Sequence, residues 1–302
     1  MTGTTKGILA TVGTFLIWGF SPLYYKMLVH VPAAEVMAHR VIWSLVFFAA
    51  LLAVQGRLGE VRGALRGRRQ VAIVVAASVL ISVNWFMLIY ATQIDRVTEL
   101  SLGYYIYPLV AVLAGRFLYG EHLSRLQVAA VAMAGAAVAL LTWGLGVLPW
   151  ISLSLAVTFG LYGILKKGLP VGPVVSVTAE VVVLMPVVAL LLFAVYREGA
   201  GHFGGSMADT LLLIGAGPMT ATPLILFSYA IRRVAMSTVG LMLYMNPTLQ
   251  FFCAVVLFGE PFTRWHAVAF PAIWLALALF TWEALRQDLA ARRAVARAAE
   301  SS

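Results

Sequence analysis

Few residues of this 302-residue chain could support charge-dependent chemistry inside its apolar stretches. Arg40 and His39 lie together in the segment His39-Arg40-Val41-Ile42-Trp43-Ser44, and Glu180 lies in a second apolar stretch. A charge at bilayer depth costs about 2.5–3.5 kcal/mol even on mild scales, so each of these side chains requires a partner, water or a function. Arginine keeps its charge, whereas a carboxylate or a histidine can exchange a proton near neutral pH.

The sequence leaves two interpretations of Arg40 and Glu180 open. An offset of 141 residues makes Glu180 equivalent to His39, so we expect Arg40 and Glu180 to approach the membrane midplane from opposite faces. They could form a substrate-binding or proton-responsive site, in which Glu180 and His39 are the candidates for proton coupling. Alternatively, they could form a structural ion pair, or Arg40 could bind backbone carbonyls.

Uncharged polar and aromatic side chains at similar depth are the other candidates. Asn84 and Asn246 are costly in lipid without a partner, so we expect them to face the protein interior. Aromatic rings with polar tips suit a pocket for an apolar or aromatic solute, although packing alone would also explain them. The predicted substrate-binding residues are Arg40, Asn84, Trp85, Tyr104, Tyr105, Glu180, Tyr244 and Asn246.

Prolines accompany the aromatic candidates in two apolar spans. Tyr104 and Tyr105 precede Pro108, and Tyr244 and Asn246 precede Pro247. A proline in mid-span removes a backbone hydrogen bond and leaves carbonyl groups free to face a cavity. We therefore expect both segments to be loosened helices that form cavity walls.

The elements that position these residues are membrane-spanning helices. With 62% apolar residues, 11% charged residues and a mean hydropathy of +0.94, the chain is far from a soluble or disordered composition. Segments of about 20 apolar residues are long enough to cross a bilayer. The sequence predicts an all-α protein with ten spans, over 7–28, 33–54, 71–92, 97–118, 125–145, 148–166, 174–195, 209–230, 235–258 and 265–285. The first is too long for the core of a cleaved signal peptide.

The distribution of basic residues explains the net charge of +9. If the N-terminus is cytoplasmic, sixteen of the 21 Lys and Arg residues fall on the cytoplasmic side, four fall outside and Arg40 lies within a span. Lys and Arg are retained on the cytoplasmic side, so both termini are predicted to be cytoplasmic. The basic charge is a topology signal and does not imply a nucleic-acid partner.

An internal repeat predicts how the spans are arranged. An offset of 139 residues aligns Tyr90–Arg125 with Tyr229–Arg264 without a gap and matches Pro108 with Pro247, among nine identical positions. Each unit holds five spans, and the odd number inverts the second copy. We expect repeats over 1–145 and 146–287, followed by a basic cytoplasmic tail over 288–302. Inverted repeats are typical of transporters, although an old duplication retained for packing is the alternative.

Motifs for catalysis, nucleotide binding and metal binding are missing from the sequence. We therefore predict no catalytic residue, no metal site, no cofactor and no nucleotide partner. Uphill transport would then require a proton gradient or a counter-solute. The single Cys253 lies in an apolar run, so no internal disulfide can form and a packing role is expected.

Several of these segments together resemble one known family. Trp18-Gly19-Phe20-Ser21-Pro22, His39 to Ser44, Asn84-Trp85, Ser101 to Pro108 and the Gly-Glu pairs at 120–121 and 259–260 are similar to the RarD branch of the EamA family, in the drug/metabolite transporter superfamily. The resemblance covers about residues 5–287. It implies ten helices in two inverted five-helix repeats around a central cavity, and a secondary carrier of small metabolites or drugs, often an exporter, in the bacterial inner membrane.

One position departs from the family pattern. Tyr107 precedes the proline in the first repeat, where relatives commonly have Asn, whereas the second repeat keeps Asn246. The sequence therefore predicts an alternating-access transporter of a small organic solute within a lipid bilayer, whose cavity is formed by spans 1–4 and 6–9. The Gly-Glu pairs are expected to end helices and bind neighbouring chain ends. A membrane-bound sensor or assembly subunit, or a membrane-embedded enzyme, is the alternative.

Overall fold

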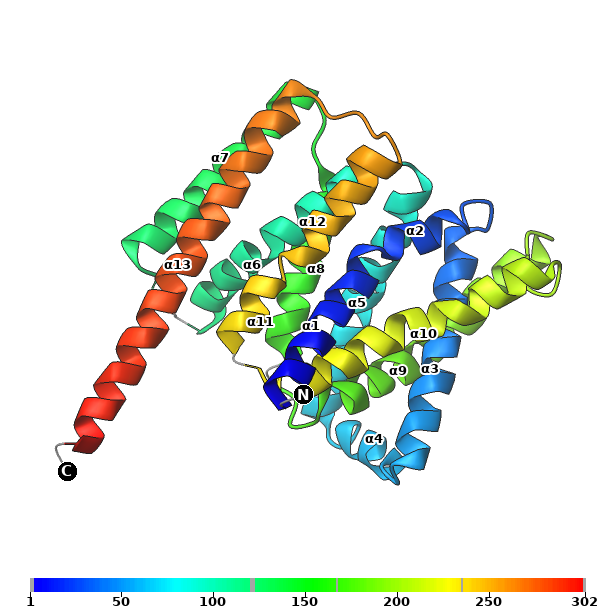
Figure 1. Cartoon of the computed structure of the whole chain (residues 1–302). Helices are drawn as coiled ribbons and strands as arrows, with labels where there is room; N and C mark the ends of the chain where they lie inside the picture. Colours follow the sequence, from blue (N-terminus) through cyan, green and yellow to red (C-terminus); the bar gives the residue numbers. More distant parts are fainter. Residues whose placement is uncertain (1–2, 120–122, 167, 235, 301–302) are drawn as a thin grey trace.

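The computed structural model describes residues 3–119, 123–166, 168–234 and 236–300, and these are helical apart from short connections. The described residues contain no β-strand. In chain order the elements are α1 (Gly3–Gly19), α2 (Ser21–Lys26), α3 (Ala33–Val54), α4 (Leu58–Ala64), α5 (Arg68–Gln93), α6 (Val97–Tyr119), α7 (Arg125–Leu145), α8 (Trp150–Lys166), α9 (Pro173–Arg197), α10 (Met207–Ala230), α11 (Met236–Met242), α12 (Met245–Phe252), the π-helix η1 (Cys253–Leu257) and α13 (Arg264–Glu300) (Figure 1).

The prediction of an all-α membrane protein with about ten spans is confirmed. Nine helical segments of the described chain are long and apolar enough to cross a membrane. The remaining predicted span, the sixth, is α8, which has 17 residues and a length of about 25 Å. This is at the lower limit for a membrane-spanning helix.

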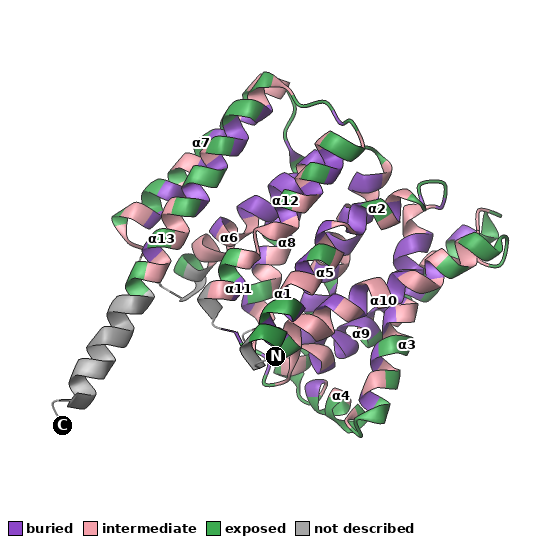
Figure 2. Cartoon of the chain, viewed as in Figure 1, coloured by how far each residue is buried: buried purple, intermediate pink, exposed green. Residues whose placement is uncertain are grey.

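The helices form a central bundle and a peripheral pair. α3 packs against α9 and α10, α8 packs against α5 and α6, and α1 packs against α10 and α12. α7 and α13 pack mainly on each other, and they lie side by side away from the centre in Figure 1. Buried residues concentrate in the central bundle, as Figure 2 shows. The bundle has two ends, here named by their connections: the α4 end also carries the start of α1, and the α9–α10 end also carries the α2–α3 turn.

The first predicted span is two helices. α1 ends at Gly19, and α2 begins at Ser21 with Pro22 in its first turn. A Cβ atom on Gly19 would lie 2.6 Å from the Cβ atom of Leu249, so only glycine permits this close approach of α1 to α12. The break therefore lies where the first and ninth spans meet.

The two proline-containing spans differ from each other. The ninth span is divided into α11, α12 and η1, as its proline suggested, but Pro108 lies inside a continuous α6. The span is therefore broken near Pro247, whereas around Pro108 the helix continues and the proline removes only the hydrogen bond to the carbonyl of Tyr104. Pro247 lies in the first turn of α12, where a backbone N–H has no intrahelical partner, so its missing N–H costs no helical hydrogen bond. The carbonyl of Leu243 accepts from the Asn246 N–H at 3.2 Å instead.

Equivalent glycines make equivalent contacts in the two halves. A Cβ atom on Gly160 would lie 3.3 Å from the side chain of Val110, as one on Gly19 would touch Leu249. Gly19 and Gly160 are related by the offset of 141 residues, and Val110 and Leu249 are related by the offset of 139. The repeat in the sequence thus corresponds to repeated packing between helices.

Candidate functional site

Arg40 lies in the middle of the bundle, on α3, with 5% of its surface exposed. Its guanidinium carbon lies 4.5 Å from the centre of the Trp85 ring and 5.5 Å from that of Tyr25. Nε donates a hydrogen bond to Thr220 Oγ1 on α10 at 2.8 Å, whereas Nη1 is buried without a partner. The charge is therefore surrounded mainly by aromatic rings, which attract cations through their faces.

Asn84 and Tyr104 form a hydrogen-bonded group close to this arginine. The Tyr104 hydroxyl donates to Asn84 Oδ1 at 2.9 Å, and Asn84 Nδ2 donates to Thr158 Oγ1 and to the carbonyl of Leu155, both at 3.2 Å. Asn84 is on α5, next to Trp85. Arg40, Asn84, Trp85 and Tyr104 thus lie in one region, here called the central cluster.

Glu180 lies in a separate ionic group near the α4 end. Its Oε1 accepts from Lys166 Nζ at 2.5 Å and from Ser176 Oγ at 2.9 Å, and its Oε2 accepts from the Tyr162 hydroxyl at 3.0 Å. Glu180 is fully buried, whereas the Lys166 side chain is 20% exposed. Arg40 and Glu180 therefore have different partners, and the ion partner of Glu180 is Lys166, which the sequence placed at the cytoplasmic boundary.

A third buried charge, Glu35, was not identified from the sequence. Its carboxylate accepts hydrogen bonds from the backbone N–H groups of His202 and Phe203 and from the Tyr196 hydroxyl, at 2.9–3.2 Å. His39 Nε2 lies 3.9 Å from Glu35 Oε1. Glu35 lies in the first turn of α3, where acidic residues are common, and that position was the available signal.

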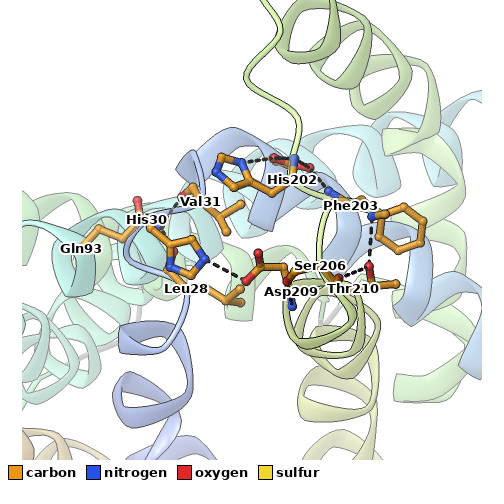
Figure 3. A network of polar contacts seen from close by, with 11 residues as sticks. Leu28, His30, Val31, Gln93, His202, Phe203, Ser206, Asp209 and Thr210 are labelled. Atoms are coloured by element: carbon orange, nitrogen blue, oxygen red, sulfur yellow. Dashed lines mark hydrogen bonds and ion pairs between the residues drawn. The ribbon is translucent and has the colours of Figure 1, made fainter.

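These contacts hold the loop over residues 198–206 against α3. The Phe203 ring stacks on His39 with centroids 4.5 Å apart. Beside it, His30 Nε2 lies 2.8 Å from Asp209 Oδ1, and the His30 and His202 rings are 5.7 Å apart. Figure 3 shows this network, in which the α2–α3 turn meets the loop and the start of α10. Several polar contacts at the α9–α10 end thus join the start of α3 and the α2–α3 turn to the loop and the start of α10.

Tyr105 and Tyr244 lie apart from the central cluster. They line a hollow of about 520 Å³ between α6, α11, α12 and α13, together with Trp274 and Trp282. The Tyr105 hydroxyl is 2.7 Å from Thr248 Oγ1, and the Tyr244 hydroxyl is 3.2 Å from Thr281 Oγ1. The tenth span therefore lines this hollow, although the sequence predicted a cavity formed by spans 1–4 and 6–9.

Asn246 is half-buried beside α1. Its Oδ1 accepts from Gln250 Nε2 at 3.1 Å, and Gln250 Nε2 lies 3.5 Å from the carbonyl of Trp18. The structure therefore groups Arg40, Asn84, Trp85 and Tyr104, and separates them from Glu180, from the Tyr105–Tyr244 pair and from Asn246.

Glu260 binds the start of α6. Its carboxylate accepts from the backbone N–H groups of Val97 and Thr98 at 2.6 and 2.7 Å, and from the Thr98 hydroxyl at 2.7 Å. Negative charge is favourable at a helix N-terminus. The expectation that a Gly-Glu pair binds a neighbouring chain end is confirmed for Glu260, whereas the pair at 120–121 lies outside the described residues.

The fold and these buried polar groups define a multi-pass α-helical membrane protein. The model of the EamA-like transporter family matches residues 5–143. Protein RarD of Salmonella typhi is 37% identical over 283 residues, which cover 93% of this chain and 96% of that protein. The uncharacterized transporter YojE of Bacillus subtilis (strain 168) is 38% identical over 294 residues, which cover 96% of this chain and 98% of that protein.

The chain belongs to the EamA-like transporter family and is a RarD-like member of it. A solved structure described as "Crystal structure of protein" aligns with a TM-score of 0.60 over 92% of this chain and 98% of that chain. At 18% identity this similarity shows a shared fold. The class of protein is therefore a membrane transporter.

Proposed function

We propose that the chain is a secondary-active transporter that moves a small organic metabolite or drug by alternating access, as an exporter or an exchanger. Membership of a transporter family supports transport in general. The finer proposal rests on the contrast between the two ends of the bundle. At the α9–α10 end, Glu260 binds the start of α6, and Glu35 holds the 198–206 loop on α3.

Part of α11, at the opposite end, is more exposed than the start of α6. In α11, Gly240 and Leu241 are exposed, whereas α6 is buried from Leu100 to Ile106. A carrier that exposes its site to one side at a time needs one sealed end and one accessible end. This contrast is the observation that carries the proposal.

The proposed orientation places the α4 end in the cytoplasm of a bacterial cell, with the protein in the inner membrane. This orientation puts the basic residues of segment 57–69 and of the C-terminal tail on the cytoplasmic side. The repeats over 1–145 and 146–287 would then be inverted relative to each other. The central cluster is the proposed substrate site, and Glu180 is the proposed second charged determinant.

The proposal is tested by counterflow and efflux assays in proteoliposomes. Arg40→Ala and Glu180→Gln are each expected to abolish transport, because each removes a buried charge from the proposed pathway. Glu60→Gln is the matched control, because Glu60 pairs with Arg57 on the exposed helix α4. Size-exclusion chromatography and thermal unfolding would establish that the variants are folded. Wild-type transport rates in both folded variants would contradict the site.

Proton coupling is a separate part of the proposal. We propose that Glu180 and His39, which lie within the spans, exchange a proton during transport. Protonation of Glu180 would remove its negative charge and release Lys166 from the ion pair. A pH gradient is expected to change the flux of the wild-type protein, and any flux that remains in Glu180→Gln is expected not to respond to the gradient. A flux that is independent of pH in the wild-type protein would refute proton coupling and leave exchange with a counter-solute.

A further inference from the structure

One stretch of α3 holds most of the buried polar atoms that have no hydrogen-bond partner. Among the residues that the structure describes, eight such side-chain atoms occur, and five of them belong to His39, Arg40, Trp43 and Ser44. Buried polar groups in proteins are nearly always paired, so such a concentration requires an explanation. Most of these atoms can donate hydrogen bonds, and a ligand with acceptor atoms would satisfy them.

The four residues lie on two adjacent strips of the helix surface. His39 and Trp43 are four residues apart and both contact Phe203, with ring centroids at 4.5 and 6.3 Å. Arg40 and Ser44 are also four residues apart, so their side chains lie one above the other on the neighbouring strip. Arg40 faces the rings of Tyr25 and Trp85. Arg40 thus places the start of the second strip in the central cluster, and Ser44 follows it one helical turn further along α3.

Arg40 is also distinguished by the absence of an opposite charge. Over the described parts of the chain, no carboxylate lies within 4.0 Å of its guanidinium. The buried carboxylate of Glu180 has Lys166, and that of Glu260 has two backbone N–H groups. An uncompensated buried charge is strongly unfavourable, so a bound anion would stabilise this arrangement.

We propose that Arg40 and Ser44 form the binding subsite for a carboxylate group of the transported solute. Thr220 holds Nε and leaves Nη1 for the ligand, while Trp85 and Tyr104 supply a surface for an apolar or aromatic body. The solute class is a small organic acid or a zwitterion with such a body. A single guanidinium balances the charge of a monoanion, whereas a phosphate dianion would require a second cation. Lys166 cannot be that cation, because it is already paired with Glu180.

This inference rests on the proposed function, and its test uses purified full-length protein. The probes are a set of small aliphatic and aromatic carboxylates, the primary amides that match them one for one, and inorganic phosphate. A ligand that binds the folded state raises its thermal stability. We expect stabilisation by carboxylates with apolar bodies, and none by the amides or by phosphate.

Substitutions assign the effect to the subsite. Arg40→Gln is expected to lower the apparent affinity for carboxylates more than tenfold, Ser44→Ala is expected to lower it several-fold, and Arg40→Lys is expected to retain part of it. Arg233→Gln and Ser228→Ala are the controls: Arg233 lies over the Tyr229 ring at the α4 end, and Ser228 donates to a carbonyl of its own helix. Both controls are expected to bind like the wild type.

Thr220→Asp keeps the test decisive if Arg40→Gln does not fold. A carboxylate at this position would be an internal counter-ion for Arg40, so the variant is expected to be more stable without ligand and insensitive to added carboxylates. A lower melting temperature together with wild-type stabilisation by carboxylates would contradict the proposal. Equal stabilisation by amides, equal stabilisation by phosphate, or the absence of stabilisation by every carboxylate would also overturn it.

Flux measurements separate this inference from the proposed function. One outcome is that carboxylates stabilise the wild type in a way that requires Arg40 while no solute crosses proteoliposome membranes. In that case the subsite is correct and the transport proposal is wrong. If amides or cations cross at the same rate in wild type and Arg40→Gln, transport is correct and the carboxylate subsite is wrong.

Discussion

α6 and the α11–α12 pair are two copies of one sequence pattern with different structures. Both contain Leu, Tyr and Pro at equivalent positions, at 102, 105 and 108 in the first copy and at 241, 244 and 247 in the second. α6 is continuous and its first half is buried, whereas the second copy is broken at Leu243–Tyr244 and partly exposed (Figure 2). The comparison teaches that the neighbouring helices, and not the proline alone, decide whether this span breaks.

A single glycine accounts for part of the difference. Gly103 lets α6 approach α8 so closely that a Cβ atom would lie 2.8 Å from the carbonyl oxygen of Ser152. The equivalent residue of the second copy is Met242, whose side chain prevents such an approach. Close packing on α8 supports the backbone around Pro108, whereas α11 has few neighbours along its length.

The largest change in stability is expected from a substitution that obstructs the close approach of α6 to α8. Gly103→Leu would force its side chain into Ser152 and Leu155 and should destabilise the protein by about 3 kcal/mol, at the upper end for overpacking. Thermal unfolding in detergent measures the change. Gly240→Ala is the comparison in the second copy, because nothing lies within 4 Å of a Cβ atom there. Equal destabilisation by both substitutions would show that close packing does not distinguish the copies.

The next largest effect concerns the bond between Glu260 and α6. Glu260→Gln weakens hydrogen bonds to Val97 and Thr98 and should lower stability by about 1.5–3 kcal/mol. It should also increase labelling of Ser101→Cys by a membrane-impermeant maleimide, in a Cys253→Ser background. Glu60→Gln, which affects an exposed ion pair, should leave the stability close to that of the wild type. Unchanged labelling would mean that Glu260 does not close this end.

Replacing each proline by alanine should have a moderate effect on transport in the second copy only. Pro247→Ala would let α11 and α12 join into one helix, and we expect transport to fall about tenfold, which corresponds to about 1.4 kcal/mol. Pro108→Ala should leave transport close to that of the wild type, because α6 is already continuous. Circular dichroism would report the gain in helix, and counterflow would report the activity. An equal loss in both variants would remove the functional difference between the copies.

The smallest expected effect is a difference in thiol labelling. In the Cys253→Ser background, Leu241→Cys should react several-fold faster with a small maleimide than Leu102→Cys, because these equivalent residues are 51% and 2% exposed. Maleimides react with hydrated thiols, so the measurement also shows whether water reaches α11. Equal rates would show that the two ends are not differently open in the membrane.

The sequence predicted the individual elements well and their contacts less well. Apolar length identified the spans, and the motif at 18–22 and Pro247 lie where helices break. Glu260 was expected to bind a chain end because it recurs with Glu121 in the repeat. Glu35 was missed because an acidic residue at the start of a helix is ordinary, and its burial depends on a loop more than 160 residues away.

Periodicity and composition by themselves determined the membrane location, the helical class and the approximate number of spans, because bilayer thickness and hydrogen bonding leave few other solutions. The sequence also singled out Arg40 and Glu180, because isolated charges are conspicuous in apolar segments. Only the tertiary structure decided that Glu180 pairs with Lys166 and that Arg40 has aromatic rings but no carboxylate beside it. Those partners come from other helices, and their distances are set by packing.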